Sequence, residues 1–171
     1  MERMNTKLTS SVLEPVYVIP YLTAQARSGI MNVSASNLSL AVAGNIICRI
    51  QNNSTNLMTS VESILVNSSA SLGYSIIRNA TLSGSLTVRP VYNLNEKYPA
   101  STSTIISSAA NATVSVSGGS TLLTQLSLTN VFNPIIVPII IQPGSSLYFS
   151  SSGSLGLNVT VNVIFCEYPV S

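Results

Sequence analysis

The chain contains no histidine, no aspartate and no tryptophan, and only 7% of its 171 residues are Asp, Glu, Lys or Arg. Soluble domains normally carry about a quarter of their residues as charges. From Tyr98 to Cys166 the chain has none of these charged residues at all. Without histidine and aspartate, His-based general-base catalysis, a Ser-His-Asp triad and most zinc sites are excluded. We therefore predict a protein that is not an enzyme and has no catalytic residues, no cofactor and no metal site.

Carboxylates are scarce as well, since the only acidic residues are Glu2, Glu14, Glu62, Glu96 and Glu167. A glycoside hydrolase needs two carboxylates that face each other, and calcium sites need clustered ones. Dispersed glutamates are typical of solvated surface positions. One enzymatic alternative stays open, a hydrolase that uses Glu62 with Glu96 or Glu167.

The two cysteines, Cys48 and Cys166, exclude a dense disulfide framework. They either form one bridge or lie buried as small hydrophobic residues, and we favour the second reading because free cysteine is among the most buried residue types. Basic residues are equally sparse and form no run, and the net charge is only +2. Nucleic-acid binding normally needs a concentrated basic surface, so we do not expect it.

Long hydrophobic runs are also missing. The longest aliphatic block, Ile135 to Ile141, is far shorter than the roughly 20 residues of a membrane helix and contains Pro138. Residues 1–11 are polar and carry both signs of charge, without the apolar core of a signal peptide. We therefore expect a soluble protein that is made in the cytosol and has no membrane partner.

What the chain does contain is 46% hydrophobic residues together with 30 Ser, 14 Thr and 16 Asn. This composition favours strands and turns. Apolar residues alternate with polar ones in many short segments, most clearly from Leu157 to Phe165. About eight to ten such segments, spaced by turn residues, predict an all-β fold, a jelly-roll β-sandwich over residues 31–171.

The sequence pattern of residues 1–30 differs from that of this domain. Val16 to Leu22 is apolar, but Pro15 and Pro20 limit it to an edge strand or an extended N-terminal arm that serves docking or assembly. A short helix over Thr9–Glu14 stays open.

Several elements of the domain can be placed more closely. Tyr74–Leu82 and Leu86–Tyr92 read as strands, and Gly118-Gly119 indicates a hairpin turn. Ile135–Ile141 is apolar on both faces, which predicts a central buried strand.

Two sequence patterns are typical of proteins that bind sugars or carry them. Tyr92, Tyr98, Tyr148 and Tyr168 can line a carbohydrate-binding face, although tyrosine is also enriched at subunit contacts. Asn-x-Ser/Thr occurs at Asn32, Asn37, Asn52, Asn53, Asn67, Asn79, Asn111 and Asn158. With so many Asn, Ser and Thr residues, we interpret these sites as a result of composition.

Four segments in order resemble the virion surface proteins of tailed bacteriophages, small jelly-roll capsid decoration or head-fibre proteins. They are Leu86–Asn95 (LTVRPVYNLN), Val116–Leu122 (VSGGSTL), Ile141–Tyr148 (IQPGSSLY) and Gly156–Tyr168 (GLNVTVNVIFCEY). The resemblance covers residues 38–168, and such proteins are similar in architecture to the trimeric tumour-necrosis-factor-like jelly rolls. Cys166 stands where the pattern has an aromatic residue before Glu167, and the N-terminal arm is not part of the pattern.

The resemblance implies a structural virion protein that assembles as a homotrimer on the phage particle, in contact with the major capsid protein or another virion protein. A charge-poor surface fits this role, because it avoids the cost of desolvating ions on assembly. The alternative is a carbohydrate- or receptor-binding adhesin module that binds a surface glycan.

Overall fold

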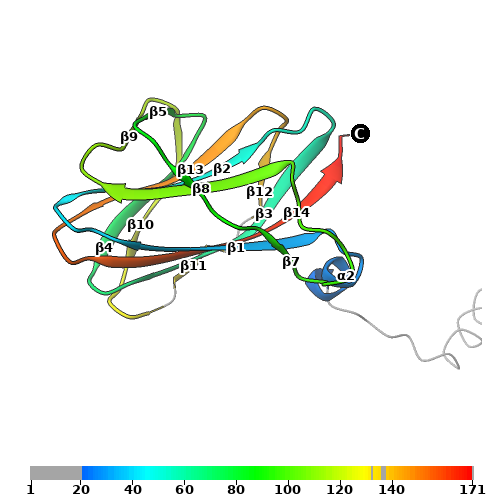
Figure 1. The fold of residues 1–171 in the computed structure, drawn as a ribbon, viewed down its shortest axis with the longest axis horizontal. Coiled ribbons are helices and arrows are strands. Elements are labelled where there is room, and N and C mark those ends of the chain that lie inside the picture. The colour runs from blue at the N-terminus through cyan, green and yellow to red at the C-terminus, as the bar shows by residue number, and fades with distance from the viewer. Residues whose placement is uncertain (1–20, 132, 136–137, 171) are drawn as a thin grey trace, which may run out of the picture.

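The computed structural model describes residues 21–131, 133–135 and 138–170. They form two antiparallel β-sheets that pack face to face, with one helix, α2 (Tyr21–Arg27), at one end (Figure 1). The prediction of an all-β sandwich is confirmed. The helix considered for Thr9–Glu14 and most of the predicted arm lie outside the described residues.

The first sheet, sheet A, is built around β14 (Asn158–Pro169), which pairs with β1 on one side and β3 on the other. The register with β1 places Met31 opposite Cys166 and Leu38 opposite Val159. The strand order is β11 (Asn133–Ile135), β3 (Leu57–Ser68), β14, β1 (Met31–Ser39) and β7 (Tyr92–Asn93), and β12 (Ile139–Ile141) also pairs with β3.

The second sheet, sheet B, packs against sheet A (Figure 1). Its strand order is β10 (Ser120–Ser127), β4 (Leu72–Arg78), β13 (Ser146–Gly153), β2 (Gly44–Asn52), β8 (Thr104–Asn111) and β6 (Thr87–Val88). The core lies between the two sheets. Within it the rings of Tyr74 of β4 and Phe149 of β13 are in contact, with centroids 5.0 Å apart.

The clean alternation predicted near the C-terminal end of the sequence is confirmed in β14. Val159, Val161, Val163 and Phe165 are buried. The residues that alternate with them, Thr160, Asn162 and Ile164, are partly exposed. Because side chains of a strand alternate between its faces, one row of β14 enters the core and the other faces outward.

A small third layer covers part of the outer face of sheet B. It consists of β5 (Thr81–Ser83) paired with β9 (Ser115–Ser117). Ile47 and Tyr148 project from sheet B into this layer and are buried with Val114. The suggestion that Tyr148 lines a surface for carbohydrate is therefore wrong.

One side of the sandwich is closed by the chain itself. The predicted single strand Leu86–Tyr92 is instead two short strands, β6 in sheet B and β7 in sheet A. Pro90 lies between them, and a proline has no N–H to continue a ladder. The crossing is fixed by Ser34 Oγ, which donates to the Pro90 carbonyl at 2.8 Å, and by Arg89 Nε, which donates to Ser108 Oγ at 2.6 Å.

The opposite side is formed by edge strands. The prediction of a central buried strand over Ile135–Ile141 is wrong, because β11 and β12 are short and pair only with β3 among the described strands. In β12, Ile139 and Ile141 are buried while Ile140 is exposed. Pro134 and Pro138 explain the difference, since proline is confined to sheet edges.

The glycine pair Gly118-Gly119 forms a turn, but not the predicted hairpin. It joins β9 to β10, and these strands pair with β5 and β4, in two different layers. Both glycines have positive φ. The strand predicted over Tyr74–Leu82 is likewise divided, into β4 and β5, at Asn79 with φ 52°.

Helix α2 occupies part of the predicted extended arm. Its residues include Ala24, Gln25 and Ala26, which are good helix formers. The helix ends at Arg27, and Gly29, two residues further on, has a φ of +75°. There the Ile30 N–H donates to the Gln25 carbonyl and the Gly29 N–H to the Ala26 carbonyl. This is a Schellman motif, which requires a left-handed residue such as glycine.

Candidate functional site

The end of the sandwich next to α2 holds a partly buried polar cluster around Glu167 of β14. Its Oε1 atom accepts hydrogen bonds from Ser101 Oγ at 2.6 Å and from Thr104 Oγ1 at 2.7 Å. Thr104 Oγ1 also lies 2.7 Å from Thr59 Oγ1, and both threonines are buried. Since Thr104 donates to Glu167, Thr59 donates to Thr104. The cluster joins β14 and β3 of sheet A to β8 of sheet B.

A pocket of about 300 Å³ opens beside this cluster and is lined by Glu167, Asn32, Asn93 and the segment 99–103. The amide side chains hold that segment in place. Asn32 Oδ1 accepts from the Ser101 N–H at 3.0 Å, and Asn93 Nδ2 donates to the Gly29 and Pro99 carbonyls. These polar groups already have protein partners, so the arrangement is suited to fixing the β7–β8 loop.

Helix α2 is attached through a buried amide. Gln25 Nε2 donates to the Tyr168 hydroxyl, and the Cys166 thiol donates to Gln25 Oε1 at 3.1 Å. Gln25 and Cys166 are both buried. The contact fixes α2 against β14.

The two cysteines are free and buried, as we favoured from the sequence. Cys48 lies in β2 of sheet B and Cys166 in β14 of sheet A. Burial raises the pKa of Cys48 to about 12 and that of Cys166 to about 11. A neutral, buried thiol is a poor nucleophile.

The glutamates of the hydrolase alternative come from three different places. Glu167 lies in the cluster between the sheets, whereas Glu62 of β3 is close enough to Cys166 to help raise its pKa. Glu96 follows β7 and lines a second pocket with Arg27. These contacts place the three carboxylates in different surroundings rather than around one site, so the hydrolase gains no support.

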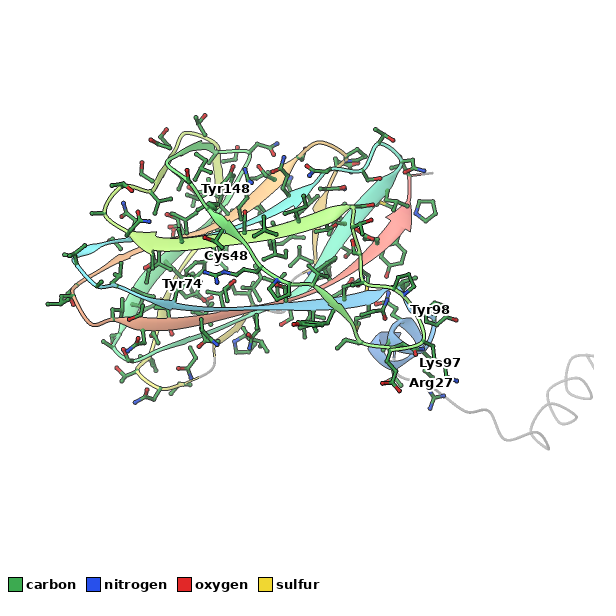
Figure 2. The ribbon with its side chains drawn as sticks, viewed as in Figure 1. Arg27, Cys48, Tyr74, Lys97, Tyr98 and Tyr148 are labelled. Atoms are coloured by element: carbon green, nitrogen blue, oxygen red, sulfur yellow. The ribbon has the colours of Figure 1, made fainter. Side chains whose placement is uncertain are left out.

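Two of the four tyrosines considered for carbohydrate binding are exposed at the α2 end of the molecule. Tyr92 is in β7, and Tyr98 lies in the following loop with its ring against Gly29. Figure 2 shows Tyr98, Lys97 and Arg27 gathered around α2, and Tyr148 far from them. Tyr168 is also at this end, bonded to Gln25.

A second surface, which we call the open edge, lies on the side opposite the β6–β7 crossing. It consists of the exposed residues Leu122, Leu126, Leu128, Val131 and Ile140. Between β10 and β12 it contains an apolar pocket of about 430 Å³, lined by Arg78, Leu122, Leu123, Ile135, Pro138, Ile139 and Ile140. Arg78 Nη2 donates to the Ile140 carbonyl at 3.3 Å and so spans the pocket.

Sequence analysis did not identify the open edge as a surface patch. The available signal was the absence of charge, because β10 contains no charged residue and no proline. Two of the Asn-x-Ser/Thr sites have a buried asparagine, which agrees with reading these sites as a result of composition. Asn32 and Asn52 are buried, and Asn52 Nδ2 donates to the Leu57 and Ile141 carbonyls.

Comparisons of the chain with protein-family models, with curated proteins and with solved structures find no match. Within the described part of the chain, no helix is long and apolar enough to cross a membrane. The same residues contain no group of three or more side chains suited to hold a metal ion. A functional proposal therefore depends on the two surfaces described above.

Proposed function

We propose that this chain is a structural virion protein, a homotrimeric capsid decoration or head-fibre protein of a phage particle. The observation that carries the proposal is the open edge, an uncharged edge strand beside an apolar pocket. The sequence resemblance over residues 38–168 supports the assignment to a virion. Its partners would be copies of itself and the major capsid protein or another virion protein.

The order of the strands supports the jelly-roll part of the proposal. In sheet A the order β1-β14-β3-β11 and in sheet B the order β2-β13-β4-β10 leave an eight-strand sandwich when the other edge strands β6, β7, β8 and β12 are set aside. The strands β1, β2, β3 and β4 alternate between the sheets, and β10, β11, β13 and β14 do so again. Two such interlocking sets are expected for the two Greek keys of a jelly roll.

The open edge is what a self-associating protein presents and a monomer avoids. Natural monomers protect edge strands with Lys, with Pro or with short length. Here β10 is eight residues long, and its Leu126 is 59% exposed. Charged residues are depleted at the centre of protein interfaces. The open edge therefore has the composition of a surface that another protein covers.

The side closed by the β6–β7 crossing differs from the open edge, and this difference bears on the symmetry of the oligomer. A two-fold dimer brings the same patch of both copies together, whereas a head-to-tail contact that closes gives a ring. A subunit whose closed and open sides differ in this way is suited to a ring. A trimer is the smallest such ring.

The oligomeric state tests this proposal. We expect light scattering at micromolar concentration to give three times the chain mass of 18.0 kDa. Leu126→Lys should shift the mass to that of the monomer. Leu155→Lys is the matched control, because Leu155 is 69% exposed but lies outside the open edge. A monomeric wild-type chain would reject the proposal.

The virion assignment needs a separate experiment. Purified particles should contain the chain, and gold labelling should place it on the capsid or on fibres. A chain that is trimeric in solution but missing from the particles would leave self-association intact and reject the virion role.

The alternative function, a glycan-binding adhesin module, is favoured by the exposed Tyr92 and Tyr98 beside a pocket of about 400 Å³ that includes Arg27. Aromatic rings next to polar groups are suited to sugar faces. A glycan array tests it. Reproducible binding that is lost in Tyr92→Ala and Tyr98→Ala, but kept in the distant control Val42→Ala, would favour the adhesin.

A further inference from the structure

We propose that the open edge is the acceptor for the N-terminal segment Val16–Ile19 of a neighbouring copy, which adds to β10 as an extra strand. The inference deepens the proposed function and rests on its self-association. It assigns to the open edge a specific occupant, a second copy of this chain.

The acceptor is the edge of β10 from Ser120 to Leu126 that faces away from β4. On one side β10 pairs with β4, from Ser120 opposite Arg78 to Ser127 opposite Leu72. On its other side the described strands provide no partner. An added strand would bond to the backbone groups left there and cover the neighbouring Leu126, in the manner of β-augmentation.

The donor has the properties of a single edge strand. Val16-Tyr17-Val18-Ile19 consists of β-branched and aromatic residues, which favour strands. Pro15 and Pro20 bound it on both sides. Proline is tolerated on the outermost strand of a sheet, and a strand added to β10 is outermost. The segment is short enough to pair within the eight residues of β10.

The charges on the two sides are complementary. Among the described residues, Arg78 is the one charged side chain that lines the pocket between β10 and β12. The charged residue nearest to Val16 along the chain is Glu14. A strand seated on β10 brings a carboxylate toward a guanidinium, a pairing that fixes orientation more than it adds affinity.

The position of α2 indicates that the donor comes from another copy. The N-terminal segment enters the described chain at Tyr21, and α2 is fixed to β14 by Gln25, whereas β10 lies on the opposite edge of the other sheet (Figure 1). Strands are spaced by about 4.8 Å and sheets by about 10 Å. From β14, the β11 edge of sheet A is two strand spacings away, about 10 Å along the sheet, and the gap to β10 in sheet B adds about 10 Å to a path around that edge. The five residues from Val16 to Tyr21 extend at most about 18 Å, which leaves no length to pass around the core.

Paired cysteines test the exchange in the full chain. Val18→Cys is combined with Thr124→Cys or with Leu126→Cys, two positions of β10 two residues apart that allow for register. The native cysteines are buried and do not compete. After mild oxidation we expect covalent dimers and trimers on non-reducing gels. Val18→Cys with Leu155→Cys is the matched control and should give none.

A mixing experiment identifies the direction of the contact. When the Val18→Cys chain is mixed with the Thr124→Cys chain, disulfides should link one chain of each kind. In the otherwise native full chain, Val18→Asp should raise the trimer dissociation constant at least tenfold, while Ser11→Asp, with the same added charge, should not change it.

The outcomes separate the two proposals. A cross-link within one chain would overturn the exchange. A trimer that forms no cross-link and tolerates Val18→Asp would overturn the exchange and leave the proposed homotrimer standing. A wild-type chain that stays monomeric would reject both.

Discussion

The hydroxyl of Thr104 donates a hydrogen bond of 2.7 Å to the carboxylate of Glu167 and so joins the two sheets at the end of the sandwich. Thr104 belongs to β8 of sheet B, and Glu167 belongs to β14 of sheet A. The same carboxylate accepts from Ser101 and thereby holds the loop that precedes β8. One acidic side chain in a charge-poor chain thus connects both layers and a loop.

We expect Glu167→Ala to lower the free energy of unfolding by about 1–3 kcal/mol, because it leaves the buried Thr104 hydroxyl without its acceptor. Urea denaturation measures the change. Glu96→Ala, in the exposed loop after β7, is the control and should stay within about 0.5 kcal/mol. Equal effects of the two substitutions would show that the Glu167 cluster does not stabilise the sandwich.

The buried thiols predict a loss of stability at alkaline pH. Burial raises the pKa of Cys48 to about 12, while an unfolded thiol has a pKa of about 8.5. Above about pH 8.5 the unfolded chain loses the thiol proton that the folded chain keeps. The contribution of Cys48 to the free energy of unfolding is therefore fully present below about pH 8.5 and is lost as the pH rises toward 12. The Cys166 pKa, raised to about 11, acts in the same direction.

We therefore expect the free energy of unfolding to fall between pH 9 and pH 11, by at most about 1.4 kcal/mol per pH unit for each thiol. Urea titrations at constant ionic strength measure it. Cys48→Ala should make the fall less steep. Burial also raises the pKa of Tyr74, so part of the decline should remain. A pH dependence identical in Cys48→Ala and wild type would contradict this origin.

The adjacent glycines of the β9–β10 turn should differ in their tolerance of alanine. Both have positive φ, which costs a non-glycine residue about 1–2 kcal/mol. A Cβ on Gly119 would also lie 2.5 Å from the Arg78 carbonyl oxygen, whereas a Cβ on Gly118 meets open space. We expect Gly119→Ala to lower the melting temperature clearly more than Gly118→Ala. The reverse order would contradict the geometry of this turn.

The edge strand β12 supplies another matched pair. Ile141 is buried and Ile140 is exposed. Ile141→Ala should destabilise the folded chain by about 2–5 kcal/mol, and Ile140→Ala by less than about 0.5 kcal/mol. Both are measured by urea unfolding at a concentration too low for self-association. Similar losses would favour the central strand that the sequence alone predicts.

The sequence predicts the fold class well because β14 and its neighbours bury one face only, and a period of two then identifies the inward row. The sequence does not predict the strand pairing near Pro90 and Pro138, where proline interrupts the hydrogen bonding between strands. Periodicity does not say which sheet a short apolar segment joins. The Ser/Thr-rich run that became β8 shows another limit. Ser107 and Ser108 are buried there and bonded to Arg49 and Arg89, which local composition does not indicate.

The candidate surfaces are harder to predict, because each depends on distant residues. Glu167 meets Ser101 and Thr104 through the pairing of the two sheets, and their separation along the chain carries no local signal. The open edge depends on which strands end a sheet. Leu126 and the inward-facing Val163 both occur in alternating segments, yet one is 59% exposed and the other is buried.

The position of β14 has a consequence for biosynthesis. This strand lies in the middle of sheet A, although thirteen other strands precede it along the described chain. On the ribosome, β1 and β3 emerge early and have to wait for the partner that belongs between them, and such distant pairings form slowly. A chain that stops short of residue 158 lacks the centre of one layer, so incomplete translation products are barred from any assembly that needs the finished sandwich.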